Sequence, residues 1–124
     1  MRFIMMVIYE SAAPDAVPTA DAKMMEYNKA LQKAGVLLAL DSLFPQSTGA
    51  RVLYVDGKAM VIDGPFAEMK EVIGGYWIIQ VRTREEAIEW ARRAPMSNNE
   101  VIEVRQIHEV HKVAEGFEPR NVVH

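Results

Sequence analysis

Two oppositely charged side chains alternate with apolar residues on the last segment that is predicted to be a strand, Val101–Val110. Glu103 and Arg105 share one face of this extended segment. Ile102 and Val104 share the other face, and they are the better partners for a hydrophobic core. The guanidinium fork of Arg105 would then be free to bind an anionic group of a small ligand, next to Glu103. The competing interpretation is a strand face exposed to solvent.

Two aspartates are candidate catalytic residues because each follows an apolar run. Asp41 would serve as a general base if desolvation raised its pKa, whereas as a plain loop cap it needs no chemical role. Asp63 begins the motif Asp63-Gly64-Pro65-Phe66. Pro65 has no N–H, so the strand before it must end at Asp63 and the chain must turn. The Asp63 carboxylate is expected to cap that turn, which makes it structural before it is chemical.

Lys70 and Tyr76 follow the same turn and are candidate ligand-binding residues. Lys70 would hold a carboxylate group of a ligand or pair with Asp63; the alternative is an exposed lysine. Tyr76 would form a wall of the site. We expect a small anionic compound to bind between Arg105, Lys70 and the Asp63 turn. Gly74-Gly75 is too short for a cofactor fingerprint, and it predicts a bulge or a close backbone approach instead.

The chain offers little for metal or cofactor chemistry, and no metal or cofactor is predicted. There are no cysteines, which excludes disulfides, thiolate nucleophiles and Cys-ligated metals. His108 and His111 are three residues apart, so on a strand they point to opposite faces and cannot easily share a metal ion. No HExxH motif and no glycine-rich phosphate loop occurs.

Composition places the chain among globular proteins of one domain. It has 124 residues, of which 50% are hydrophobic and 25% charged. The net charge of −3 gives no support to nucleic-acid binding, which needs a clustered basic surface. No apolar run approaches the length of a membrane span, which is about 20 residues. A cytoplasmic protein with no membrane partner is the default expectation.

Hydrophobic periodicity predicts an alternation of strands and helices. Residues 3–9 and Val36–Leu40 read as strands, the second of them buried, and Val101–Val110 as the last strand. The run Tyr76–Val81 is apolar on both faces, which predicts a central strand. Asp56-Gly57 between two apolar runs predicts a hairpin over residues 51–62.

Two helices are predicted between these strands. Thr19 can cap the first, which has an apolar stripe that includes Met24, Tyr27 and Leu31, and Gly35 ends it. The second begins at the capping box Thr83-Arg84-Glu85-Glu86 and ends at Pro95, with a buried stripe formed by Ala87, Trp90, Ala91 and Ala94.

Without the hairpin the element order is βαβ followed by βαβ, which predicts an α+β, ferredoxin-like antiparallel sheet of the βαββαβ type with an inserted β-hairpin. Each helix has one apolar stripe, so both helices must cover the same face of the sheet. The other face is left bare and apolar, and two such faces stacked together would form a homodimer. Residues 1–110 are expected to form the domain, and residues 111–124 a C-terminal tail or dimer arm.

The motif Asp63-Gly64-Pro65-Phe66, together with Lys70-Glu71 and Gly74-Gly75-Tyr76, resembles the DGPF branch of the YCII-related family. Similar matches cover residues 34–38, 87–91 and 103–105, so the resemblance extends over roughly residues 3–108. It implies a dimeric α/β barrel, an acid near Asp41, and a family that is mostly without assigned chemistry. Several relatives carry a proposed catalytic histidine at a position that aligns near Met24, and methionine cannot transfer protons.

These observations leave two functions from different classes, and a purely structural dimer as a third hypothesis. The first is a small-molecule enzyme of the isomerase, lyase or dehalogenase type, acting on a small anionic compound in the barrel; it rests on relatives of the fold. The second is a non-catalytic ligand-binding or regulatory protein. The resemblance links this branch to alternative sigma factors, and the methionine in place of the histidine favours the second function.

Overall fold

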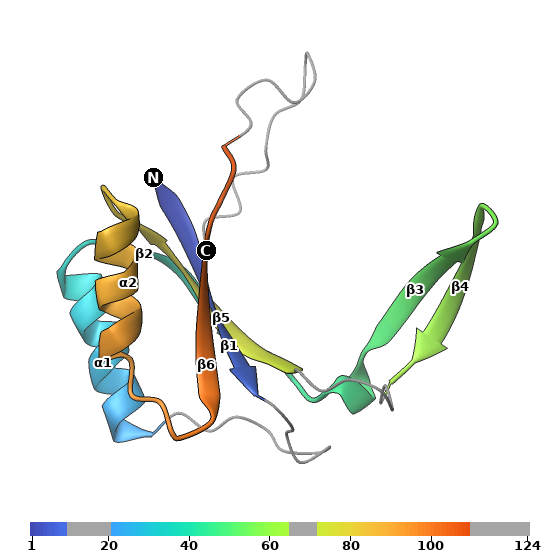
Figure 1. Ribbon diagram of the computed structural model, residues 1–124. Helices are drawn as coiled ribbons and strands as arrows, with labels where there is room; N and C mark the ends of the chain where they lie inside the picture. Colours follow the sequence, from blue (N-terminus) through green and yellow to red (C-terminus); the bar gives the residue numbers. More distant parts are fainter. Residues whose placement is uncertain (10–20, 65–71, 110–124) are drawn as a thin grey trace.

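The alternating pattern of the sequence gives one four-stranded sheet, two helices and a separate two-stranded hairpin (Figure 1). The computed structural model describes residues 1–9, 21–64 and 72–109. Their elements are β1 (Arg2–Tyr9), α1 (Ala22–Lys33), β2 (Leu37–Ser42), the short 3-10 helix η1 (Gln46–Thr48), β3 (Ala50–Val55), β4 (Lys58–Asp63), β5 (Val72–Gln80), α2 (Arg84–Arg93) and β6 (Glu100–Gln106).

The sheet has the order β2-β5-β1-β6, and every neighbouring pair is antiparallel. β1 and β5 occupy the centre, as the apolar run of Tyr76–Val81 predicts. Both helices cover one face of this sheet (Figure 1). The predicted ferredoxin-like α+β architecture, with a hairpin inserted between β2 and β5, is therefore confirmed.

Strand β2 differs from its prediction. The segment Val36–Leu40 was expected to be buried, but the strand spans Leu37–Ser42 and lies at the edge of the sheet. The side chains of Leu38 and Leu40 are 44% and 38% exposed. The apolar run correctly indicates a strand, but only β5 pairs with it, so one side of β2 has no covering strand in the described part of the chain.

Helix α1 begins two residues later than the sequence suggests. Its N-cap is Asp21, whose Oδ1 accepts a hydrogen bond of 2.7 Å from the Met24 N–H. The predicted cap, Thr19, lies outside the described residues. The helix ends as predicted, because Gly35 adopts the left-handed conformation with φ of 73°.

Helix α2 is capped by Thr83, as its sequence predicts. The Thr83 hydroxyl accepts a hydrogen bond of 3.1 Å from the Glu86 N–H. The returning bond of the capping box is displaced by one residue, because Glu86 Oε2 accepts from the N–H of Arg82 at 3.3 Å. Within the described residues, neither helix is long and apolar enough to cross a membrane.

The hydrophobic core lies between the helices and one face of the sheet. Phe3, Met5, Leu31 and Ile79 are fully buried there. Trp90 was expected to be buried with the α2 stripe, but it packs at the margin of this core and is only half-buried. The Arg93 guanidinium lies over its outer side, 4.1 Å from the ring centroid, so the indole keeps one solvated side.

No helix of the described residues covers the opposite face of the sheet (Figure 1), and we call it the helix-free face. Strand alternation places Ile4, Met6 and Ile8 of β1 on this face, where they are half-buried. Ile73 and Val101, which pair with Ile8 from both sides, are 46% and 51% exposed. The face is therefore apolar along its centre, as the single helical layer predicts.

The hairpin of β3 and β4 confirms the prediction from Asp56-Gly57. Both turn residues have positive φ, 50° and 77°, as a type I′ turn requires. Val52 pairs with Val61 and Leu53 with Met60 across the two strands. All twelve strand residues are exposed.

The buried side of α1 predicts a large stability difference between two of its positions. Leu31→Ala should cost about 2–5 kcal/mol of unfolding free energy, because Leu31 is fully buried and the cavity left behind cannot collapse completely. Met25→Ala on the same helix is the control, since Met25 is 51% exposed; its cost should stay within about 0.5 kcal/mol. Urea denaturation measures both, and equal costs would contradict the packing described.

Stability should fall steeply at high pH because of Tyr27. Burial raises the pKa of Tyr27 to about 12, and the nearby Arg93 charge lowers it by less. The folded protein therefore holds a proton that the unfolded chain releases near pH 10. Stability is fully present below pH 10 and declines by about 2–3 kcal/mol as pH rises to 12. Tyr27→Phe should remove this part of the decline and leave the part due to Tyr9 and Tyr76, whose pKa values are also raised, while Tyr54→Phe, at a 74% exposed position, should keep all of it.

Candidate functional site

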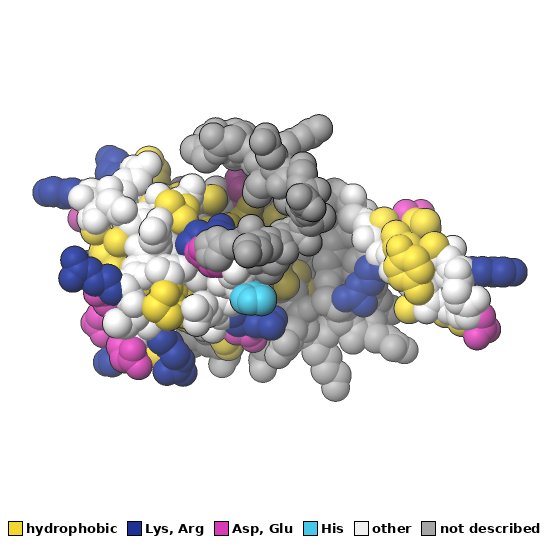
Figure 2. Space-filling view, turned by 90° about the horizontal axis from the view of Figure 1, so that it is seen from above, with side chains coloured by type: hydrophobic (Ala, Val, Ile, Leu, Met, Phe, Trp, Pro, Cys, Tyr) yellow, Lys and Arg dark blue, Asp and Glu magenta, His cyan; other side chains and the backbone are white. Residues whose placement is uncertain are grey.

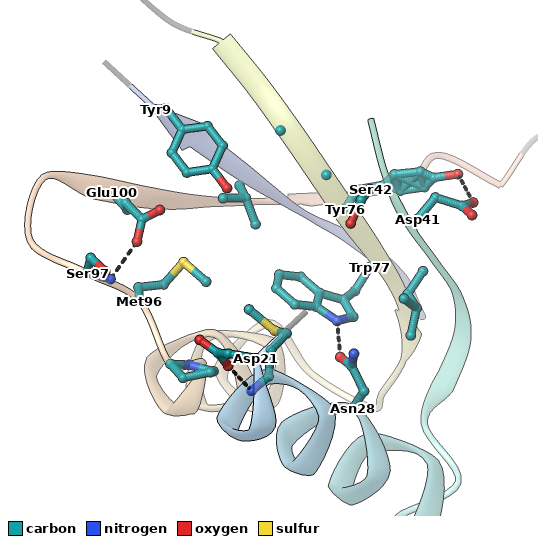
Figure 3. A pocket seen from close by; sticks show the side chains of 16 residues that line it. Tyr9, Asp21, Asn28, Asp41, Ser42, Tyr76, Trp77, Met96, Ser97 and Glu100 are labelled. Carbon is teal, nitrogen blue, oxygen red and sulfur yellow. Dashed lines mark hydrogen bonds between the residues drawn. The ribbon is translucent and has the colours of Figure 1, made fainter. Parts of the chain in front are cut away.

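A cavity of about 260 Å³ opens between the helix-covered side of the sheet, the start of α1 and the loop after α2 (Figure 3). One part of its wall is aromatic and apolar and includes Tyr9, Trp77 and Met96. Polar side chains face the same space, among them Asn28 and Glu100. A concave wall that combines aromatic and apolar side chains with convergent polar groups is typical of sites that bind small molecules.

Two glycines of β5 make room for this cavity. Gly74 is the extra residue where the β1–β5 register shifts, and a Cβ placed on it would lie 2.0 Å from the ring of Tyr9. A Cβ on Gly75 would lie 2.9 Å from the carbonyl oxygen of Asp41. Both predicted features, a bulge and a close backbone approach, are present.

Trp77 fixes the floor of the cavity. Its indole N–H donates a hydrogen bond of 2.8 Å to Asn28 Oδ1 on α1 (Figure 3). Its ring meets the ring of Tyr27 edge to face, with centroids 5.5 Å apart. The wall formed by Trp77 is therefore held in place by helix α1 and is not free to rotate.

Asp41 and Tyr76 form a hydrogen-bonded pair at the rim of the cavity. They are register partners on β2 and β5, and the Tyr76 hydroxyl donates to Asp41 Oδ2 at 2.7 Å (Figure 3). The pKa of Tyr76 is raised, first by this hydrogen bond, then by partial burial and by the Asp41 charge. The pair therefore combines a carboxylate acceptor with a phenol that keeps its proton at neutral pH.

Two further carboxylates line the cavity and have partners of their own. Asp21 caps α1, and Glu100 Oε1 accepts a hydrogen bond of 2.5 Å from the Ser97 N–H. Burial raises the pKa of Tyr9, and the Glu100 charge adds to the rise. Among the described lining residues there are three carboxylates, with Asp41, and no lysine, arginine or histidine. The described part of the wall thus supplies no positive side chain to an anion.

The other predicted site residues lie elsewhere. Glu103 and Arg105 are exposed on the helix-free face, opposite Met6 and Ile4 of β1. Ile102 and Val104 pack against the core, so the assignment of the two faces of β6 is confirmed. Their roles in ligand binding stay predictions.

The turn predicted to hold two site residues is only partly described. Asp63 ends β4, as predicted, and is exposed opposite Ala50, away from the cavity lining. Lys70 and the helical turn predicted after Pro65 lie outside the described residues. Their contribution to a ligand site stays a prediction.

Sequence reasoning missed Asn28, Trp77 and Glu100 as lining residues. A signal for Asn28 was present, because it lies four residues after Met24 on the buried stripe of α1, where a polar side chain needs a partner. Trp77 reads only as an apolar residue of a central strand. Glu100 enters the cavity through the loop after α2, for which no periodic pattern exists.

Comparison with known proteins identifies a family and a relative for this chain. The family model described as the YCII-related domain matches residues 1–111. The chain is also similar to an uncharacterised protein of Rhizobium meliloti (strain 1021), with 33% identity over 82 residues. That match covers 63% of this chain and 66% of the relative, so the chain spans just under two thirds of that protein's length.

The Asp41–Tyr76 hydrogen bond predicts a linked titration. Asp41→Asn should lower the pKa of Tyr76 toward its ordinary value, because the charged acceptor that favours the protonated phenol is lost. The phenolate absorbance of the protein, compared with that of Tyr76→Phe in each background, isolates this group. Glu103→Gln removes a carboxylate from the same face without this bond, and it should leave the Tyr76 titration unchanged. An unchanged titration in Asp41→Asn would mean that the pair does not form in solution.

Proposed function

Since this chain belongs to the YCII-related family, we propose that it is a small-molecule enzyme in which Asp41 transfers protons to and from a substrate held at the cavity and Tyr76 stabilises the negative charge that forms on it. The observation that supports this most is the 2.7 Å contact of the two side chains at the rim of a cavity of about 260 Å³. That volume suits a ligand of modest size.

The chemistry follows from the protonation states of the pair. Asp41 Oδ2 accepts a proton from a carbon next to a carbonyl group of the substrate, and the electron pair moves to the carbonyl oxygen. The Tyr76 hydroxyl, which is protonated at neutral pH, turns from Asp41 to that oxygen and stabilises its negative charge by a hydrogen bond, keeping its own proton. Return of the proton to another carbon gives an isomerase, and loss of a leaving group gives a lyase.

An anionic substrate is the form we propose, and its binding depends on residues beyond the described cavity wall. Arg105 shares the helix-free face with Tyr76 but lies two strands away, about 10 Å by strand spacing. A small substrate at Asp41 of one chain cannot span that distance easily. A second copy stacked on the helix-free face would bring its own Arg105 and Glu103 over the same space.

The homodimer is therefore part of this proposal. The apolar centre of the helix-free face, with Ile73 and Val101 about half exposed, supports pairing of two such faces. Asp41 and Tyr76 occupy the same face by register, so the reactive pair would lie beside the contact between the two chains. The assignment to the DGPF branch rests on Asp63-Gly64-Pro65-Phe66 and belongs to the proposal as well.

One observation favours a second function. Met24 lines the cavity at the place where, by resemblance, several relatives have a proposed catalytic histidine. Without a proton-transferring group there, the same cavity would serve a ligand-binding protein without catalysis, with a regulatory role linked to an alternative sigma factor. Asp41 would then contribute to binding only.

A screen of small organic acids separates the two functions. Compounds that bind only the folded protein raise its melting temperature, and each such compound is then tested for turnover. For an enzyme, Asp41→Asn should lower turnover by about 100-fold or more while the ligand still raises the melting temperature. Glu85→Gln, in the first turn of α2 and far from the cavity lining, is the matched control with full turnover. Stabilising compounds that are never converted would support the binding protein, and full turnover by Asp41→Asn would contradict the enzyme.

A further inference from the structure

The hairpin of β3 and β4, residues 50–63, is the most exposed apolar segment in the described part of the chain, and we call it the arm. It extends away from the sheet and helices (Figure 1). Tyr54 is 74% exposed, Val61 68% and Met60 52%. Figure 2 shows the apolar side chains gathered on this projection.

Both faces of the arm carry several apolar side chains. Strand register places Val52, Tyr54 and Val61 on one face and Leu53, Met60 and Ile62 on the other, which also carries Arg51 and Lys58. A hairpin at a protein surface normally has one polar face, and a lone two-stranded hairpin is at best marginally stable in water. An arm that exposes apolar side chains on both faces is therefore expected to be covered by another surface.

The base of the arm is tightly held. The Gly64 N–H donates a hydrogen bond of 2.9 Å to the Gly49 carbonyl, which closes the end of the hairpin. A Cβ on Gly64 would lie 1.8 Å from the Gln46 carbonyl oxygen, so only glycine permits this backbone approach. The backbone at the base of the arm is therefore fixed by specific contacts.

The direction and length of the arm identify what covers it. The helices lie on one side of the sheet and the arm projects on the other, the side of the helix-free face (Figure 1). Each arm strand has six residues, which corresponds to about 20 Å, whereas stacked sheets lie about 10 Å apart. A second sheet on the helix-free face would therefore lie within the depth that the arm reaches.

We infer that the arm packs against a second copy of this chain, along the side of that copy. The inference rests on the proposed pairing of helix-free faces, which places a second copy beside the arm. One chain then carries two apolar surfaces that its described residues leave uncovered, the arm and the helix-free face, and a symmetric partner covers both. Two arms, one from each chain, enclose the pair.

Charge substitutions on each face of the arm test this inference in the full-length protein. Leu53→Lys with Met60→Lys alters one face, and Val52→Lys with Val61→Lys alters the other. Because these side chains are already exposed, the fold of a single chain should persist, which circular dichroism checks. Sedimentation should show at least one double variant with a dimer dissociation constant raised ten-fold or more. Met25→Lys, at a 51% exposed methionine of α1, is the control and should dimerise like the wild type.

A variant of the helix-free face separates this inference from the pairing on which it rests. Val101→Lys should weaken the dimer by itself, since Val101 is 51% exposed on that face. If Val101→Lys dissociates the dimer and both arm variants remain as tightly paired as the wild type, the pairing stands and the role of the arm is overturned. A wild-type chain that stays monomeric at concentrations up to about 100 micromolar overturns both the pairing and the role of the arm, because an obligate dimer would persist at such a concentration.

Hydrogen exchange gives a readout that does not depend on the variants. Amides of residues 50–63 in the wild-type protein should exchange more slowly as protein concentration rises through the dimer transition. Exchange of these amides that is independent of concentration, while the dimer forms, would refute the contact even if a lysine variant failed to fold.

Discussion

The indole of Trp77 holds the layers of this protein in position. It donates its N–H to Asn28 of α1 at 2.8 Å and meets the Tyr27 ring edge to face. The Tyr27 hydroxyl in turn donates to the Trp90 carbonyl of α2 at 2.6 Å. This series of contacts connects the sheet with both helices. An unmade hydrogen bond in such a half-buried position costs about 1–3 kcal/mol, so the helices have one favoured position on the sheet. The same indole lines the cavity, which makes the shape of the site a consequence of how the core is packed.

Much of the fold is readable from the sequence because the controlling signals are local. Asp56-Gly57 requires positive φ, and Thr83 has an acceptor oxygen three residues before Glu86. The prediction that Val36–Leu40 is buried is wrong, because an apolar run indicates a strand but does not indicate whether another element covers it. Glu100 was missed as a cavity residue because only tertiary packing brings its loop to the cavity, whereas Asn28 was marked by its place on the buried stripe of α1 but its partner Trp77 was not. Asp41 and Tyr76 were each predicted, yet only the β2–β5 register makes them a pair.

The position of that pair joins the two sides of the sheet. Both residues contribute to the lining of the cavity, whose floor is Trp77 on the helix side, while strand alternation directs the Asp41 and Tyr76 side chains to the helix-free face. The pair therefore lies at the rim, where the edge strand β2 meets β5. Changes on either face of the sheet are therefore expected to reach the same two side chains. Gly74 and Gly75, next to Tyr76, have no Cβ atoms and so permit the close approach of the Tyr9 ring and of the Asp41 carbonyl oxygen.

The pairing of β1 has a consequence for how the chain folds as it is synthesised. This strand lies at the centre of the sheet, but its partners come late: Ile4 pairs with Ile78 of β5 and with Arg105 of β6, about 100 residues further on. Until β5 has left the ribosome, Phe3, Met5 and Val7 have no strand to pair with and stay apolar and unprotected. Such distant pairings close large loops before any contact is gained, which slows folding to the millisecond-to-second range. The nascent chain is therefore expected to need protection at its N-terminal strand, and to acquire its sheet in one late step.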